Sequence, residues 1–294
     1  MLLHEGLAVY ESWSLTPPIP APPSRLYSLA PVNLGTADSE SLTSYIARLA
    51  QAHHVTVAAL FGLEIAPLVD RNYFNNKTRG SGILRVLGSP FHDLARAMNG
   101  IGRTATDLTR AVEALTLRSD IRLLTMKPWA NVFAQCRLLR LTHAACFSCY
   151  EEWRIQGKVI SDPLLWALEV VRVCPKHDRP LSLHCPFCHR TLLQLASHSR
   201  PGHCSQCGEW LGSFASATLT DGNTLTDDEW NQARWMANAA GELIAVASGL
   251  TSAPPRERLA QAITTQARRF AGKRAPLARL LQMDHSTLGD WQRG

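Results

Sequence analysis

The chain has 294 residues, of which 46% are hydrophobic and 18% charged, with a formal net charge of +6. This hydrophobic share supports a folded core and excludes global disorder, and the length indicates two or three modules. The positive charge suits an anionic partner such as nucleic acid without naming one. Residues 1–13 lack the basic region and apolar run of a signal peptide, and no stretch approaches the ~18 apolar residues of a membrane span. We therefore expect a cytoplasmic protein with no membrane partner and reduced thiols.

The N-terminal third begins with a proline-rich stretch, residues 14–35, which can neither continue a helix nor pair in a central strand. We expect residues 1–37 to form an extended lead-in that wraps the surface or contacts a partner.

Residues 38–62 predict two short helices joined by a tight turn. Apolar residues recur at helical spacing in the first helix, at Leu42, Tyr45, Ile46 and Leu49. Asp38 or Ser39 is the expected N-cap of this helix, and Thr56 is the expected N-cap of the second. His53 and His54 interrupt the helical pattern, and we expect them at the surface. Val57, Leu60 and Phe61 supply the apolar face of the second helix, so the pair resembles a helix-turn-helix unit.

Residues 63–135 predict irregular helical structure with one clear amphipathic helix at 105–119. Leu108, Val112 and Leu115 share one face of that helix. Cys136 stands alone in an apolar run, and a lone cysteine of this kind is usually a core residue.

Residues 143–214 hold seven of the eight cysteines. The cysteines and one histidine form four pairs, each with two intervening residues: Cys146 and Cys149, Cys174 and His177, Cys185 and Cys188, Cys204 and Cys207. Each spacing lets one tight turn direct two side chains to one point, and two such turns complete a tetrahedron around Zn²⁺. Pairing nearest neighbours in sequence gives two sites of four ligands each, with an interleaved arrangement as the alternative.

Both predicted sites are closed by four protein ligands, so we expect two structural zinc ions and no enzyme activity. Disulfides are disfavoured by the reducing compartment. A zinc deaminase needs a proline before its C-x-x-C pair, but His184 precedes Cys185. Four histidines flank the second site and are expected beside the ligands or at the surface, with His203 as the first substitute ligand: His184, His189, His198 and His203.

After Gly222 the sequence is again rich in residues that favour helices. We expect one helix from about residue 227 and a basic helix at 256–270. Residues 271–294 resemble the helix-turn-helix of Xre/Cro-type DNA binders, including the terminal Trp291-x-x-Gly294. Ser286 is the expected N-cap of the second helix, with Leu288 and Trp291 packed inward.

This second resemblance implies a set of DNA contacts. Base-facing residues would be His285, Ser286, Thr287, Asp290 and Arg293, and phosphates would meet Arg268, Arg269, Lys273 and Arg274. A protein-interaction surface is the alternative.

These patterns together predict a mainly α fold with small zinc-binding β elements. It would carry a helix-turn-helix-like N-terminal unit, two central zinc fingers or ribbons, and a C-terminal helix-turn-helix. The expected divisions are an extended lead-in, a helical N-terminal domain, a double zinc-binding domain and a helical C-terminal domain: 1–37, 38–142, 143–214 and 215–294.

Five motifs occur in order between residues 38 and 214: SESLTSYIARLA, CFSC, CPKHDRPL, HCPFCHRTL and HCSQCGEWL. This series resembles the TniQ family, which includes the TnsD-type target selectors of bacterial transposons. One departure is Phe147, where the family usually has proline after the cysteine.

The resemblance implies a non-enzymatic adaptor in DNA transposition. Such an adaptor links a target-recognition element, either a CRISPR RNA-guided effector complex or a DNA site, to a TnsC-like AAA+ ATPase that recruits the transposase. The proline-rich lead-in and residues 39–61 would engage the ATPase or the effector. The zinc modules would brace the adaptor and touch DNA or partner protein.

Two rival interpretations remain at this point. One is a sequence-specific transcription regulator with zinc ribbons and a helix-turn-helix, and the other is a zinc hydrolase or deaminase. The sequence does not decide between an RNA-guided complex and double-stranded DNA as the target, and it leaves homodimerisation open.

Overall fold

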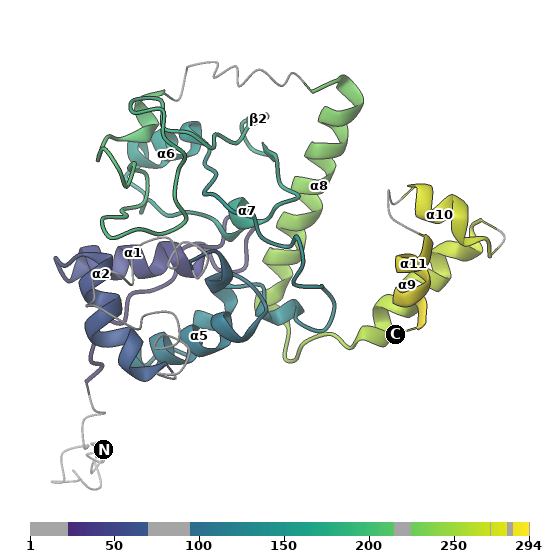
Figure 1. The fold of residues 1–294 in the computed structure, drawn as a ribbon, viewed down its shortest axis with the longest axis horizontal. Helices are drawn as coiled ribbons and strands as arrows, with labels where there is room; N and C mark the ends of the chain where they lie inside the picture. Colours follow the sequence, from purple (N-terminus) through teal and green to yellow (C-terminus); the bar gives the residue numbers. More distant parts are fainter. Residues whose placement is uncertain (1–22, 70–94, 215–224, 271, 281–284, 294) are drawn as a thin grey trace, which may run out of the picture.

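A computed structural model describes residues 23–69, 95–214, 225–270, 272–280 and 285–293 (Figure 1). Several predictions fall on residues that the structure does not describe. These residues are the first part of the proline-rich lead-in, the range 70–94 of the irregular helical region, and Leu281 and Gly294 near the C-terminus. Of several predicted DNA-contact residues, only the backbone is described: Arg274, His285, Thr287, Asp290 and Arg293.

The described chain is mainly helical, with one short antiparallel pair of strands. The elements are α1 Leu42–Ala52, α2 Val57–Leu60, η1 Phe61–Ile65, η2 Ala66–Leu68, α5 Arg103–Thr116, η4 Ile121–Leu124, η5 Lys127–Trp129, α6 Phe147–Ile155, α7 Leu164–Ala167, β1 Val173–Cys174, β2 Arg179–Pro180, η6 Leu211–Phe214, α8 Asp227–Val246, η7 Ala247–Gly249, α9 Arg256–Arg268, α10 Arg274–Leu280 and α11 His285–Arg293. The predicted fold class, mainly α with small β elements near candidate metal sites, is confirmed.

Helix α1 and the short helix α2 form around the predicted turn. The N-cap of α1 is Ser41, whose hydroxyl accepts a hydrogen bond from the Ser44 amide, so the prediction of Asp38 or Ser39 was wrong. The side chain of Thr56 caps α2, as predicted, by accepting from the Ala59 amide. His54 takes a left-handed conformation between the two helices, with φ +55°.

In the described residues, no single helix has the length and apolar composition needed to cross a bilayer. One consecutive pair, Leu42–Ala52 with Val57–Leu68, passes such a test jointly but is bent by 101°.

Helix α5 corresponds to the predicted amphipathic helix. It buries Leu108, Val112 and Leu115, and it ends at Thr116 because Leu117 adopts a left-handed conformation. Cys136, in contrast, is exposed, so its assignment to the core was wrong.

The buried apolar residues form separate clusters. The first joins α1, α2 and α5, together with Leu195. The second is built on residues 143–214, which we call the metal-binding segment, and it includes one face of α8. The third lies among α9, α10 and α11, around Ile263, Leu277 and Leu288. In Figure 1, α8 runs alongside the metal-binding segment, and the yellow helices α9 to α11 lie beyond its lower end.

A chain of buried polar contacts fixes α1 against the metal-binding segment. The Tyr150 hydroxyl donates to Asp162 at 2.5 Å, and the Asp162 amide donates to the Ser44 hydroxyl at 2.9 Å. That hydroxyl donates to Glu40, which also accepts from Arg48. Glu40, Ser44 and Tyr150 are buried, so each needs its partner, and the network specifies one relative position of the two parts.

The C-terminal helices follow the predicted order with one change at α11. The helix starts at His285, so Ser286 lies within it and is not its N-cap as predicted. Leu288 is fully buried and Trp291 packs against the same small core. The spacing of apolar residues therefore predicted the packing of α11 more accurately than its first residue.

Candidate metal centres

The first cluster combines a helix start with a hairpin. Cys146 is the N-cap of α6 and Cys149 lies in its first turn, so this pair is held by a helix and not by the free turn that its spacing suggested. Cys174 ends β1, and His177 lies in the turn that leads to β2. The register of the two strands, with Cys174 opposite Arg179, returns the histidine toward the sulfurs.

The ligand atoms of the first cluster converge on one point. His177 Nδ1 lies 3.2 Å from the Cys149 sulfur, 3.6 Å from that of Cys146 and 3.7 Å from that of Cys174. The sulfurs of Cys149 and Cys174 are 3.6 Å apart.

The second cluster is formed by two similar loops. Each loop begins at a cysteine whose carbonyl accepts a hydrogen bond four residues on, from the His189 amide in one and the Gly208 amide in the other. Isolated bridges close them, His184 with Thr191 and His203 with Trp210. The Cys185 and Cys207 sulfurs lie 3.6 Å apart, and those of Cys188 and Cys204 lie 3.8 Å apart.

These distances fit tetrahedral metal ions. Sulfurs that each lie about 2.3 Å from a tetrahedral ion are about 3.8 Å apart, and a sulfur and an imidazole nitrogen are about 3.6 Å apart. A disulfide needs about 2.0 Å between the sulfurs, and all eight cysteines are free thiols. The two groups match the pairing predicted from nearest neighbours in sequence, and each could hold one metal ion.

Burial and contacts among the sulfurs shift the pKa of several of the thiols. Hydrogen bonds from the thiols of Cys149 and Cys174 lower the pKa of Cys146 to about 3, and the same bonds raise the pKa of the two donors. Burial raises the pKa of Cys185 to about 12. The sulfurs therefore cannot all become thiolates at neutral pH unless a cation offsets their repulsion.

Residues around the first cluster hold its ligands in position. His177 Nε2 lies 3.2 Å from Glu152, and this carboxylate also accepts from Lys176 at 2.7 Å. A carboxylate on the outer nitrogen fixes the imidazole so that Nδ1 faces the sulfurs. Asp178, next to His177, accepts from Trp230 and Arg234 of α8. The sequence offered no spacing signal for these contacts, because the residues come from distant elements.

The histidines beside the second cluster do not join its ligand atoms. His203 Nδ1 lies 3.1 Å from the Gly208 carbonyl oxygen, and its ring packs against Trp210. His184 and His189 are exposed. Four cysteines therefore form this group, without His203 as a substitute.

The predicted DNA-contact residues lie on the C-terminal helices. Arg268 and Arg269 are exposed at the end of α9, Lys273 is exposed before α10, and Ser286 is exposed on α11. Contact with DNA remains a prediction for the whole set.

A mainly helical chain with two four-ligand Cys/His groups is typical of proteins that use metal ions for structure. Residues 31–181 match the family model TniQ, which covers half of the chain and includes the first cluster. The chain belongs to the TniQ family, so it is a transposition-associated protein. A comparison with curated proteins finds no match.

Proposed function

We propose that the protein is a non-enzymatic adaptor that links a target-recognition complex to the AAA+ ATPase of a transposon. Membership of the TniQ family, a non-catalytic adaptor family, carries this proposal. The target element would be a CRISPR RNA-guided effector or a DNA site, and the protein would act in the cytoplasm.

We also propose that both ions are zinc and structural. Three thiolates with one imidazole, or four thiolates, form the donor sets that zinc prefers. Cys146, Cys149, Cys174 and Cys185 are buried, and four protein ligands complete a tetrahedron in each group. A catalytic zinc ion needs an open position for water, so this donor count supports bracing over hydrolysis.

The basic C-terminal helices support a DNA-contacting role within the adaptor. They share a core of their own, as an independent binding unit would. The same observation favours the second candidate, a sequence-specific transcription regulator.

A gel-shift series with double-stranded DNA separates the two candidates. The adaptor is expected to shift DNA poorly alone and strongly with its AAA+ ATPase and ATP. Tight sequence-selective binding without the ATPase, unchanged by its addition, would contradict the adaptor and support the regulator.

Paired arginine variants then test where DNA binds. Arg268→Ala with Arg269→Ala is expected to weaken the shift, because both arginines are exposed at the C-terminal end of α9. Arg256→Ala with Arg258→Ala removes the same charge at the opposite end of α9 and is the matched control. Equal loss in both pairs would contradict the predicted contact.

A further inference from the structure

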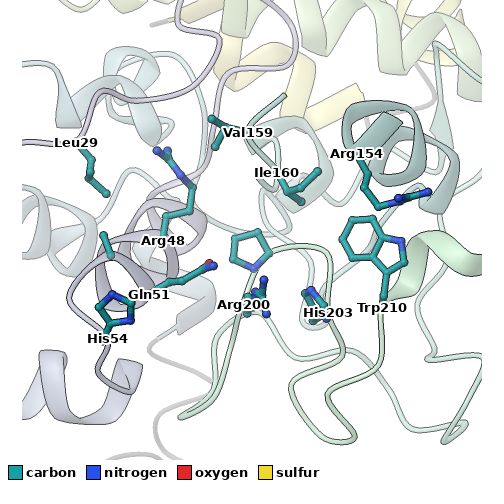
Figure 2. A pocket seen from close by; sticks show the side chains of 12 residues that line it. Leu29, Arg48, Gln51, His54, Arg154, Val159, Ile160, Arg200, His203 and Trp210 are labelled. Atoms are coloured by element: carbon teal, nitrogen blue, oxygen red, sulfur yellow. The ribbon is translucent and has the colours of Figure 1, made fainter. Parts of the chain in front are cut away.

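A hollow of about 900 Å³ lies between α1, the segment after α6 and the loop of the second metal cluster (Figure 2). Its volume is in the range of ligand sites. We call it the arginine pocket, and its lining includes Arg48, Arg154, Ile160, Arg200 and Trp210.

The charged side chains that line this pocket are all positive. Arg48, Arg154 and Arg200 come from three different elements, and the lining contains no aspartate or glutamate. Figure 2 shows Arg48 toward one side, Arg154 with Trp210 toward the other, and Arg200 between them. The cations are therefore spread around the pocket, an arrangement that suits a chain of negative charges better than a single anion.

The three arginines are not equivalent. Arg48 is paired with the buried Glu40, and Arg154 is paired with Glu151 at 2.5 Å. Both guanidinium groups are thereby held in place as partly neutralised donors. The Arg200 side chain is exposed, and its guanidinium group makes no hydrogen bond or ion pair with any residue that the structure describes, so it supplies the uncompensated charge.

The uncharged lining is apolar and aromatic. Ile160 and Trp210 are half-buried, and the indole Nε1 donates to Glu151 at 3.1 Å, which fixes the ring beside Arg154. A flat aromatic side chain next to guanidinium groups is the combination that stacks an unpaired base while its phosphates meet cations. A duplex would present only its backbone here, because its bases are already stacked inside the helix.

From this pocket we infer a binding site for an unpaired nucleotide of a nucleic acid strand. The base would enter beside Trp210, and the flanking phosphates would contact Arg200 and the exposed edges of Arg48 and Arg154. The site shares a loop with the second metal group but contains none of its cysteines, and it lies apart from the C-terminal helices. It does not depend on the adaptor role.

Other anionic occupants fit the lining less well. Sites for free nucleotides commonly offer backbone amides of a glycine-rich loop or a helix start to the phosphate, and here the cations are side chains spread over three elements. An acidic peptide would use a strand edge or a longer apolar groove, and neither β1 nor β2 contributes to the lining.

Fluorescence anisotropy of the full chain with a labelled oligouridine of about 12 nucleotides tests the site. Arg200→Ala is expected to weaken binding at least about threefold and to reduce the slope of log affinity against log salt by about 0.7, the loss of one phosphate contact. Arg190→Ala, an exposed arginine outside the lining, is the matched control and should leave both unchanged. Equal effects of the two variants would overturn the inference.

Photocrosslinking then places the base. A single 5-iodouridine in the same strand is expected to crosslink to Trp210, as mapped by mass spectrometry. Crosslinks only outside the lining would overturn the inference.

Competition identifies the kind of ligand. Uridine monophosphate, polyglutamate and a duplex of equal length should each compete more weakly than the unlabelled strand, and equal competition by any of them would overturn the proposal. In a protein that also carries Arg268→Ala and Arg269→Ala, Arg200→Ala should weaken binding of the strand by the same factor. A failure of the proposed DNA contact on α9 can therefore be told apart from a failure of the arginine pocket.

Discussion

Glu40 carries the buried carboxylate in the network that connects α1 with the metal-binding segment. Its side chain is fully buried, accepts from the Val32 amide, Ser44 and Arg48, and pairs with Arg48, which is 13% exposed. Burial raises the pKa of Glu40 to about 7, although Arg48 and the hydrogen bonds act in the opposite direction. A buried carboxylate therefore changes charge near neutral pH at this junction.

The pH dependence of stability should reveal this group. The folded-state pKa is above the unfolded value of 4.5, so the stabilisation is present below pH 4.5 and is lost as pH rises through about 7. The free energy of unfolding of the wild type, relative to Glu40→Gln, should fall by roughly 2–3 kcal/mol between about pH 5 and pH 8. Denaturant unfolding measures it, and taking the difference cancels the pH dependence of the metal sites.

Glu64→Gln is the matched control for this experiment. Glu64 pairs with Arg25 at the surface, and that hydrogen bond lowers its pKa. The stabilisation by Glu64 is therefore lost only as pH falls below about 4.5, so the Glu64 difference should stay nearly constant between pH 5 and pH 8. A Glu40 difference that is constant with pH would contradict the buried-charge account.

Gly202 shows how one residue shapes the loop of the second metal cluster. Its φ is +79°, and an added Cβ would lie 2.2 Å from the Trp210 ring and 2.9 Å from Ile160. Glycine is required here both for the backbone conformation and for the close packing of the indole.

We expect Gly202→Ala to destabilise the protein by roughly 2–4 kcal/mol, from backbone strain and overpacking together. Gly157→Ala is the control, because its φ is +65° and an added Cβ meets no atom within 4 Å. It should cost only about 1–2 kcal/mol. Thermal unfolding of both variants measures the difference, and equal destabilisation would show that the Trp210 contact is unimportant.

At the scale of elements, α6 and α8 pack in the core of the metal-binding segment and not with the N-terminal helices. Helix α6 carries Cys149, and α8 buries Ala233, Ala237 and Ile244 in the core that contains cysteines of both candidate metal groups. Helices α1 and α5 belong to the other large cluster. Loss of the ions should therefore affect these two sets of helices differently.

Hydrogen exchange with and without a chelator tests this division. Chelation is expected to raise amide exchange in α6 and α8 first, because structural metal contributes to folding free energy. Protection in α1 and α5 should persist longer. Simultaneous loss in all four helices would contradict two cores, and no loss would contradict a structural role for the metal.

The sequence predicted the elements whose signals are local. Leu108, Val112 and Leu115 have helical periodicity, Thr56 is a good cap, and the C-x-x-C spacing anticipated the grouping of the ligands. Helix α6 was missed because its helical signal is weak and its cysteines suggested a turn. The arginine pocket could not be predicted, because Arg48, Arg154 and Arg200 are more than forty positions apart and meet only in the folded chain.

For the whole molecule, the metal-binding segment occupies the central position. It packs against α1 through the Glu40 network and against α8 through Asp178, and α8 leads on to the basic helices α9 to α11. A rigid centre that connects an N-terminal unit with a separate basic end is the architecture an adaptor needs. This account fails if the centre is not held by metal.

Native mass spectrometry of the reduced full-length chain, purified without added metal, tests this claim most directly. The account predicts the polypeptide mass plus two zinc ions, with one ion lost in Cys149→Ser and the other in Cys188→Ser, because these cysteines belong to different groups. A chain that carries no zinc, or one whose two variants lose the same ion, would contradict it.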